Sequence, residues 1–337
     1  MSVYASIYGC MGTALTDEER RFFRDVRPWG FILFARNIDE PEQVRRLIAE
    51  LREAAGHEAE VLIDQEGGRV QRLRPPYWRA YPPGRRFGEL YERNVETGLH
   101  AARLGAKLIA AELRYLGFTV DCLPVLDVPV PGAHDVIGDR AYALTPGPVA
   151  ALGLAAAEGL LAGGVLPVIK HIPGHGRAGV DSHLSLPVVD TPADVLEQID
   201  FAPFHALRHL PLAMTAHVVY SAYDAERPAT TSRLVIEDVI RGHIGFDGLL
   251  MSDDLSMEAL SGSLGERARA SLAAGCDLVL HCNGKMDEMR AIAPEVPILS
   301  GVARERSEKA ISLRKSSLVP LDIDLALRQF SALTAVS

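Results

Sequence analysis

The chain has 337 residues, of which 48% are hydrophobic and 23% are charged, a balance typical of globular proteins and unlike disordered or fibrous ones. Its 35 Lys and Arg and 44 Asp and Glu give a formal net charge of −9. This charge argues against nucleic acid or a membrane surface as partner and favours a small-molecule substrate.

The four cysteines show no C-x-x-C spacing, and a chain of this size does not need disulfides. We therefore expect reduced thiols and a cytoplasmic protein. Residues 1–12 contain no Lys or Arg and no apolar core, so we expect no signal peptide. The apolar stretch 149–169 is broken by Glu158 and Pro167, which indicates a buried helix and a strand rather than a membrane span.

Short apolar runs alternate with amphipathic segments along the chain. Most runs have four to six residues, are rich in Val, Ile, Leu and Phe, and lack polar alternation, as in parallel strands buried on both faces. The eight predicted strands are residues 3–9, 30–34, 60–63, 118–122, 165–170, 212–215, 248–252 and 278–281.

Helix signals lie between these strands. Thr16 and Glu19 form a capping box, and Asp39 and Glu42 form another before a helical apolar pattern that ends at Gly56. Further helices are predicted at 99–116, from residue 191, at 257–274 and at 303–315, with a loose tail after the last.

Eight such β-then-α units predict an α/β fold, a single-domain (β/α)₈ barrel over residues 1–337, with a short C-terminal helix and tail at about 303–337. An open doubly wound sheet is the alternative, but no G-x-G-x-x-G follows the first strand. No repeat or linker marks a second domain. We expect a monomer.

Barrels of this kind place their active sites at the carboxyl ends of the strands. Ionisable side chains follow nearly every predicted strand, where packing alone does not require them. They include Arg36 after the second strand, Asp64, Glu66, Arg69 and Arg72 after the third, Asp127 and Arg140 after the fourth, Lys170, His171, Asp181 and His183 after the fifth, His217 after the sixth, Asp253 and Asp254 after the seventh, and His281 after the eighth.

Two adjacent carboxylates follow the seventh strand. Asp254 suits a helix cap, because the predicted helix begins just after it. Neighbouring residues of a strand point to opposite faces, so we expect only one of the two, Asp253, to face the pocket.

The segment 170–183 gives the strongest local indication of ligand binding and catalysis. Its glycines allow a sharp bend near a ligand. Asp181 and His183 are two residues apart and would point to the same side of an extended loop, where the carboxylate makes the imidazole an acid/base group near neutral pH. Lys170 ends a predicted strand and is interpreted as a residue that binds the ligand, whereas His175 and His217 are interpreted as structural. A solvated polar loop is the alternative.

Asp64 followed by Glu66, with Arg69 and Arg72 beyond, suits a polyol, because a carboxylate accepts from two hydroxyls while an arginine donates to their oxygens. A glycine turn with a salt bridge explains these residues equally well. Arg140 is similarly ambiguous.

Three motifs resemble glycoside hydrolase family 3: Lys-His-Ile-Pro-Gly-His-Gly at 170–176, Asp-Ser-His at 181–183 and Ser-Asp-Asp-Leu-Ser-Met at 252–257. Segments 64–72 and 138–140 narrow the resemblance to the single-domain β-N-acetylglucosaminidases of bacterial peptidoglycan recycling. It covers essentially the whole chain. It implies a retaining exo-enzyme that hydrolyses terminal GlcNAc from fragments such as GlcNAc-1,6-anhydro-MurNAc and its peptides, with no cofactor and no metal.

The same resemblance assigns roles to residues. It implies that Asp253 is the nucleophile and that Asp181 and His183 form an acid/base dyad. It places sugar binding at Asp64, Arg72, Arg140, Lys170 and His171. The family commonly has Phe where Ile172 stands here, an exchange of one apolar residue for another.

Other functions remain open. Phosphorolysis would replace water by phosphate, and the substrate acetamido group could itself be the nucleophile. A metallohydrolase could use His171, His183, His217 and Asp253 as ligands. A non-catalytic amino-sugar-binding barrel would keep Asp64, Lys170 and Arg140 but has no reason to keep Asp253 and His183 together.

Overall fold

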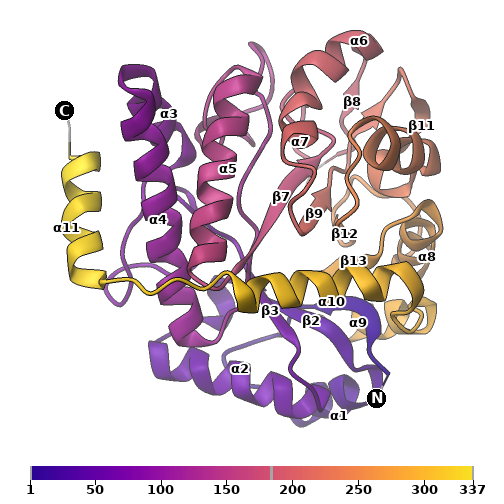
Figure 1. The fold of residues 1–337 in the computed structure, drawn as a ribbon. Helices are drawn as coiled ribbons and strands as arrows, with labels where there is room; N and C mark the ends of the chain where they lie inside the picture. Colours follow the sequence, from indigo (N-terminus) through magenta and orange to yellow (C-terminus); the bar gives the residue numbers. More distant parts are fainter. Residues whose placement is uncertain (1, 183–184, 336–337) are drawn as a thin grey trace.

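The structure is a computed structural model that describes residues 2–182 and 185–335. Eight parallel strands close into a barrel in the order β1, β13, β12, β9, β7, β6, β3, β2 (Figure 1). They are β1 (Tyr4–Tyr8), β2 (Pro28–Leu33), β3 (Glu60–Ile63), β6 (Val120–Asp121), β7 (Leu166–Ile172), β9 (Leu212–Thr215), β12 (Leu249–Asp254) and β13 (Leu278–His281). Each predicted strand supplies one barrel strand, so the predicted (β/α)₈ fold is confirmed.

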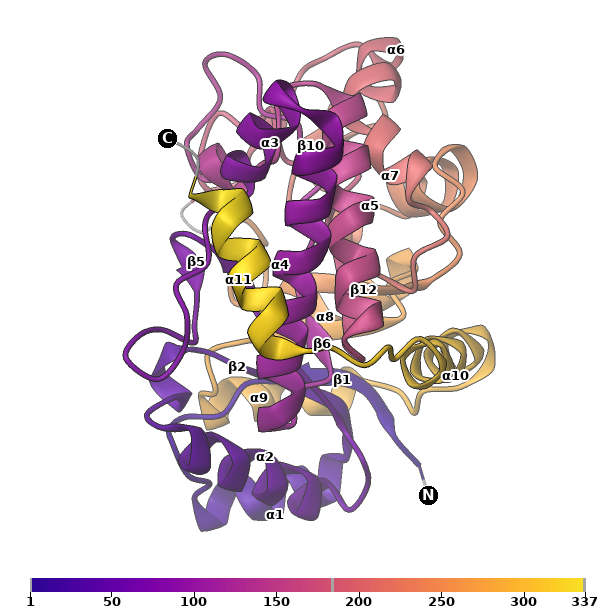
Figure 2. The same ribbon diagram turned by 60° about the vertical axis from the view of Figure 1, so that its left-hand side comes forward.

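Helices surround the barrel (Figures 1 and 2). They are α1 (Asp17–Val26), α2 (Pro41–Ala55), α3 (Gly84–Arg93), α4 (Val95–Leu116), α5 (Pro146–Ala162), α6 (Ala193–Val195), α7 (Ala202–Ala206), α8 (Leu264–Ala274), α9 (Met286–Ile292), α10 (Gly301–Ser316) and α11 (Ile323–Thr334), with π-helical segments at Leu196–Asp200 and Val235–His243. No helix of the described ranges is long and apolar enough to cross a membrane.

Short additional strands follow the carboxyl ends of several barrel strands. The pair β4 (Gln65–Gly67) and β5 (Val70–Gln71) directly follows β3. A small sheet of β8 (Val188–Val189), β10 (Val219–Tyr220) and β11 (Asp224–Pro228) lies beyond β7 and β9 along the chain. These additions place polar residues above the strand ends, where the site is expected.

The helix starts follow local capping only in part. The Thr16 hydroxyl accepts from the Glu19 amide at 3.1 Å, and the Glu19 carboxylate accepts from the Thr16 amide at 2.8 Å, which confirms the first capping box. The second is wrong: α2 begins after Glu40, which makes no side-chain cap, and the Asp39 amide instead donates to the Gln43 side chain at 2.9 Å. The side chain of Gln43 thus provides the hydrogen-bond acceptor for the backbone just before α2.

Two helical predictions in the C-terminal half are wrong. The helix expected over 257–274 begins only at Leu264, where Ser263 and Glu266 form a capping box. The tail after residue 315 is not loose, because it contains α11, which lies alongside α4 (Figure 2). Its Phe330 is buried and packs against Tyr81, with tilted rings whose centroids are 6.0 Å apart. This long-range packing stabilises a helix that the local sequence signals poorly.

Candidate active site

A cavity of about 170 Å³ lies at the carboxyl ends of the barrel strands. Its lining residues are Ile32, Phe34, Asp64, Val70, Arg72, Arg140, Lys170, His171, Met214, Asp253, Asp254, Met257, Leu280 and Cys282. Six of the predicted site residues are therefore brought together, from segments almost 190 residues apart in sequence. Asp181 is half-buried and does not line this cavity, and His183 lies outside the described residues.

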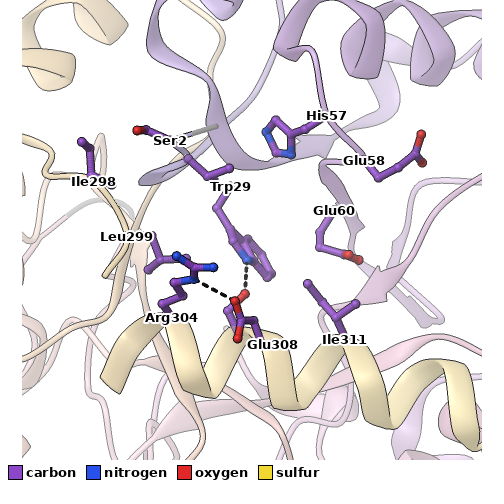
Figure 3. Close-up of a pocket in the computed structure, with 12 residues that line it drawn as sticks. Ser2, Trp29, His57, Glu58, Glu60, Ile298, Leu299, Arg304, Glu308 and Ile311 are labelled. Atoms are coloured by element: carbon purple, nitrogen blue, oxygen red, sulfur yellow. Dashed lines mark hydrogen bonds and ion pairs between the residues drawn. The ribbon is translucent and has the colours of Figure 1, made fainter. Parts of the chain in front are cut away.

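A larger cavity of about 450 Å³ lies at the opposite, amino-terminal end of the barrel, beside α10 (Figure 3). Most of its polar groups already have partners: the Trp29 indole N–H donates to the Ser307 hydroxyl at 2.7 Å, and Arg304 pairs with Glu308 at 2.7 Å. Because barrel enzymes use the carboxyl ends of their strands, we assign the active site to the smaller cavity.

Five charged side chains form a continuous chain along one wall of the site. Arg72 contacts Asp64 at 3.0 Å, and Asp64 contacts the Lys170 ammonium at 2.9 Å. The same ammonium lies 2.6 Å from Glu66, which receives two hydrogen bonds from Arg140, at 2.8 and 2.9 Å. We call these residues the charge cluster.

Burial and ion pairing act in opposite directions on this cluster. Burial alone would raise the pKa of Asp64 and Glu66, but the cations beside them outweigh burial and lower both, that of Glu66 to about 2. Burial would likewise lower the pKa of Lys170, but Asp64 and Glu66 raise it. All members are therefore charged at neutral pH. The cluster offers fixed donors and acceptors to sugar hydroxyls and no titrating proton.

The lowered carboxylate pKa values predict a loss of stability in acid. An acid whose folded pKa lies below its unfolded value of about 4.3 stabilises the fold above that value, and this contribution disappears as the pH falls toward the folded pKa. We expect the free energy of unfolding, measured by urea titration, to fall between about pH 4.5 and pH 2. Glu66→Gln should flatten this dependence, and an unchanged pH slope in that variant would contradict it.

Strand irregularities turn consecutive residues toward the cavity. The pairing of β7 with β9 shifts register between Lys170 and Ile172, and that of β12 with β13 shifts between Met251 and Asp254. A bulge places neighbours on one side of a strand. Asp253 and Asp254 consequently both line the cavity, and the prediction that only one faces it is wrong.

The predicted helix-capping role of Asp254 is also wrong. Its Oδ1 accepts from the Ser256 amide at 3.1 Å and from the Cys282 amide at 3.0 Å, and its Oδ2 accepts from the Ser256 hydroxyl at 2.6 Å. The carboxylate thus holds the turn after β12 against the end of β13. Asp253 Oδ1 accepts from the Asp254 amide at 2.8 Å, which fixes its position at the cavity wall.

The two histidines interpreted as structural are buried outside the cavity lining. Burial lowers the pKa of both, that of His175 to about 4, so they are neutral at pH 7. His217 bonds through Nδ1 to the Thr230 hydroxyl at 2.7 Å and through Nε2 to the Asp254 carbonyl at 3.0 Å. It therefore supports the strand end that carries Asp253.

The sequence analysis left one residue of this region, Asp127, without a role and expected another, Arg69, at a site whose cavity it does not line. Asp127 binds His171, and its position after a strand end was the available signal. Glu66, expected to help bind a polyol, completes the charge cluster. Arg69, expected to help bind a polyol, instead pairs with Asp135 at 3.3 Å and Asp139 at 3.1 Å outside the cavity. Within residues 2–182 and 185–335, no three His, Cys, Asp or Glu side chains are grouped as metal ligands.

Known proteins resemble the chain over most of its length. The profile described as "Glycosyl hydrolase family 3 N terminal domain" matches residues 9–311. A protein named Beta-hexosaminidase from Aromatoleum aromaticum is 39% identical over 318 residues, which cover 93% of this chain and 88% of that protein. One of the same name from Thioalkalivibrio sulfidiphilus is 40% identical over 311 residues, covering 89% and 88%.

A solved structure agrees with these matches. NagZ from Neisseria gonorrhoeae, in complex with N-trifluoroacetyl-D-glucosamine, superimposes with a TM-score of 0.88 at 31% identity and covers 99% of both chains. The family match, the barrel and the carboxylate-lined cavity at its carboxyl end point to one class of enzyme. The chain therefore belongs to glycosyl hydrolase family 3 and is a glycoside hydrolase, as its sequence motifs predict.

Proposed function

We propose that this protein is a retaining exo-β-N-acetylglucosaminidase that removes terminal GlcNAc from peptidoglycan fragments. The observation that carries the proposal is the position of Asp253 on the wall of a small cavity that four members of the charge cluster, Asp64, Arg72, Arg140 and Lys170, also line. A carboxylate facing an anomeric carbon can act as nucleophile. Charged donors and acceptors on another wall suit the hydroxyls of one sugar ring.

The amino-sugar specificity is supported by the relatives. The gonococcal structure contains an N-acyl glucosamine, and the two sequence relatives are named Beta-hexosaminidase. Apolar residues also line the cavity, including Met214, Met257 and Leu280. They provide an apolar surface against which an acetamido methyl group can pack.

The proposed reaction has two steps. Asp253 attacks the anomeric carbon, forming a glycosyl-aspartate as the glycosidic C–O bond breaks, while His183 donates a proton to the leaving oxygen. His183 then takes a proton from water, which attacks the anomeric carbon and releases Asp253. Asp181 fixes the tautomer of His183 and raises its basicity. The roles of Asp181 and His183 rest on the sequence motif.

An acid/base histidine suits the proposed substrate. A neutral imidazole does not repel an anionic aglycone, such as the lactyl group of an anhydro-muramic acid, whereas a second carboxylate would. We therefore propose GlcNAc-1,6-anhydro-MurNAc and its peptides as substrates, and a monomeric cytoplasmic enzyme that acts on them.

Two assays test the function. Release of an aryl alcohol from an aryl β-N-acetylglucosaminide should establish hydrolysis, and a fluorinated sugar substrate should leave a label on the Asp253 peptide in mass spectrometry. Label on another residue, or none, would exclude the covalent aspartate. Sugar 1-phosphate formed in phosphate buffer would instead establish phosphorolysis.

His183→Ala tests the acid/base role. Loss of a general acid typically costs about 10²- to 10⁴-fold. We expect such a loss of kcat/KM with alkyl or disaccharide substrates. The loss should be much smaller with a dinitrophenyl glycoside, because its dinitrophenolate leaving group departs without a proton. His100→Ala, an exposed histidine of α4, is the matched control. Equal losses with both substrate types would count against the assignment.

A further inference from the structure

A buried carboxylate outside the cavity binds a residue inside it. Asp127 is 0% exposed and does not line the cavity. Its Oδ2 lies 2.7 Å from His171 Nδ1, and its Oδ1 accepts from the backbone amides of His171 at 3.2 Å and His175 at 2.7 Å. Burial would raise the pKa of Asp127, but His171 and these hydrogen bonds lower it to about 2. Asp127 is therefore ionised, and His171 Nδ1 carries the proton that it receives.

This contact determines what His171 presents to a ligand. In the ring tautomer that keeps its proton at Nδ1, beside Asp127, Nε2 is unprotonated and accepts a hydrogen bond. His171 lines the cavity next to Lys170, whose ammonium is a donor. The pair thus offers one acceptor and one donor to neighbouring hydroxyls.

The second contact of Asp127 leads to the loop after β7. The His175 amide donates to the Asp127 carboxylate, and the His175 ring Nε2 lies 3.1 Å from the hydroxyl of Ser182. Ser182 is buried and stands between Asp181 and His183 in the sequence. The rings of His171 and His175 pack edge to face, with centroids 5.6 Å apart.

Backbone contacts hold the first part of this loop on the segment that carries Asp127. The Val130 amide donates to the Gly176 carbonyl at 3.3 Å, and the His134 amide donates to the Ala178 carbonyl at 2.9 Å. Gly176 lies so close to Val128 that a Cβ would collide with its carbonyl oxygen. The segment that follows Asp127 in the chain is therefore in direct backbone contact with the first part of the loop.

We propose that Asp127 is a positioning residue that orients His171 toward the sugar and, through His175 and Ser182, holds the loop that carries the acid/base residues. The inference rests on the proposed glycosidase function and adds to it a residue that no sequence motif assigns. It predicts two separable defects, one in sugar binding and one in protonation of the leaving group.

Asp127→Asn and Ser182→Ala separate the two defects. The Asn carbonyl can still accept from both backbone amides, but its NH₂ group donates to His171 Nδ1 and so moves the ring proton to Nε2. The sugar-facing acceptor becomes a donor while the loop contact persists. Ser182→Ala removes the His175 contact and leaves His171 unchanged.

Kinetics with GlcNAc glycosides of graded leaving-group pKa give the readout. Asp127→Asn should lower kcat/KM about 10- to 100-fold, the range for a hydrogen bond to a charged group, mainly through KM and equally for all leaving groups. Ser182→Ala should lower kcat only for poor leaving groups. Asp277→Asn is the control for destabilisation, because that buried carboxylate holds Arg241 and the Leu250 amide at the other end of the barrel.

The outcomes distinguish a failure of this inference from a failure of the proposed function. Wild-type kcat/KM for Asp127→Asn, or a loss that Asp277→Asn reproduces, would overturn the inference while the wild-type enzyme still hydrolyses the aryl glycoside. A wild-type enzyme without that activity would instead refute the proposed function. If Asp127→Asn does not fold, ¹⁵N chemical shifts of the His171 ring in the wild-type protein remain decisive. They should show a protonated Nδ1, and an unprotonated Nδ1 would overturn the inference.

Discussion

Asp253→Asn should lower kcat for every GlcNAc glycoside by more than the about 10³-fold that loss of one transition-state hydrogen bond costs. The amide is a poor nucleophile and cannot form the glycosyl-enzyme, so good and poor leaving groups should suffer alike. The free energy of unfolding, measured by urea titration, should change little, because Asp253 is only half-buried at the cavity wall. Steady-state kinetics with aryl glycosides measures the effect.

A smaller side chain provides a stronger test. In Asp253→Gly, added azide should restore turnover and yield an α-configured glycosyl azide, because direct displacement inverts the anomeric carbon. Asp247→Asn is the matched control: it lies just before β12, its side chain is 82% exposed, and it pairs with Arg306. A β-configured azide product, or substantial activity in Asp253→Asn, would contradict the nucleophile assignment.

Lys170→Met should be the most destabilising substitution in the site. The side chain of Lys170 is 2% exposed, and its ammonium lies between Asp64 and Glu66. Removing one partner of a buried ion pair costs about 3–5 kcal/mol, because the remaining charge is left uncompensated. Two like charges remain here. We expect a correspondingly lower free energy of unfolding at pH 7, measured by urea titration.

The pH dependence of this variant separates electrostatics from packing. Without the ammonium, the pKa values of Asp64 and Glu66 should rise, so lowering the pH neutralises them and should reduce the deficit relative to the wild type. Adding Glu66→Gln to Lys170→Met should recover part of the stability. Lys309→Met, an exposed lysine of α10, is the control. A deficit that is the same at pH 4 and pH 8 would indicate lost packing instead.

Local sequence patterns were sufficient for the architecture and for the family. Strands buried on both faces are continuous apolar runs, and such runs can be recognised without knowing their neighbours. The capping box of Thr16 and Glu19 joins residues three apart, so it too is visible in the sequence. Polar residues after the strands indicate the end of the barrel at which the candidate cavity lies.

Only the tertiary structure decided how those polar residues are paired. Asp64 meets Lys170 across 106 positions and Glu66 meets Arg140 across 74, contacts that exist because the barrel closes. The register shifts that bring both Asp253 and Asp254 to the cavity depend on neighbouring strands, as does the packing of α11. The sequence by itself determined which residues form strands and which chemistry follows them, because these are local properties. The partners, orientation and burial of each charge depend on distant segments and therefore required the folded barrel.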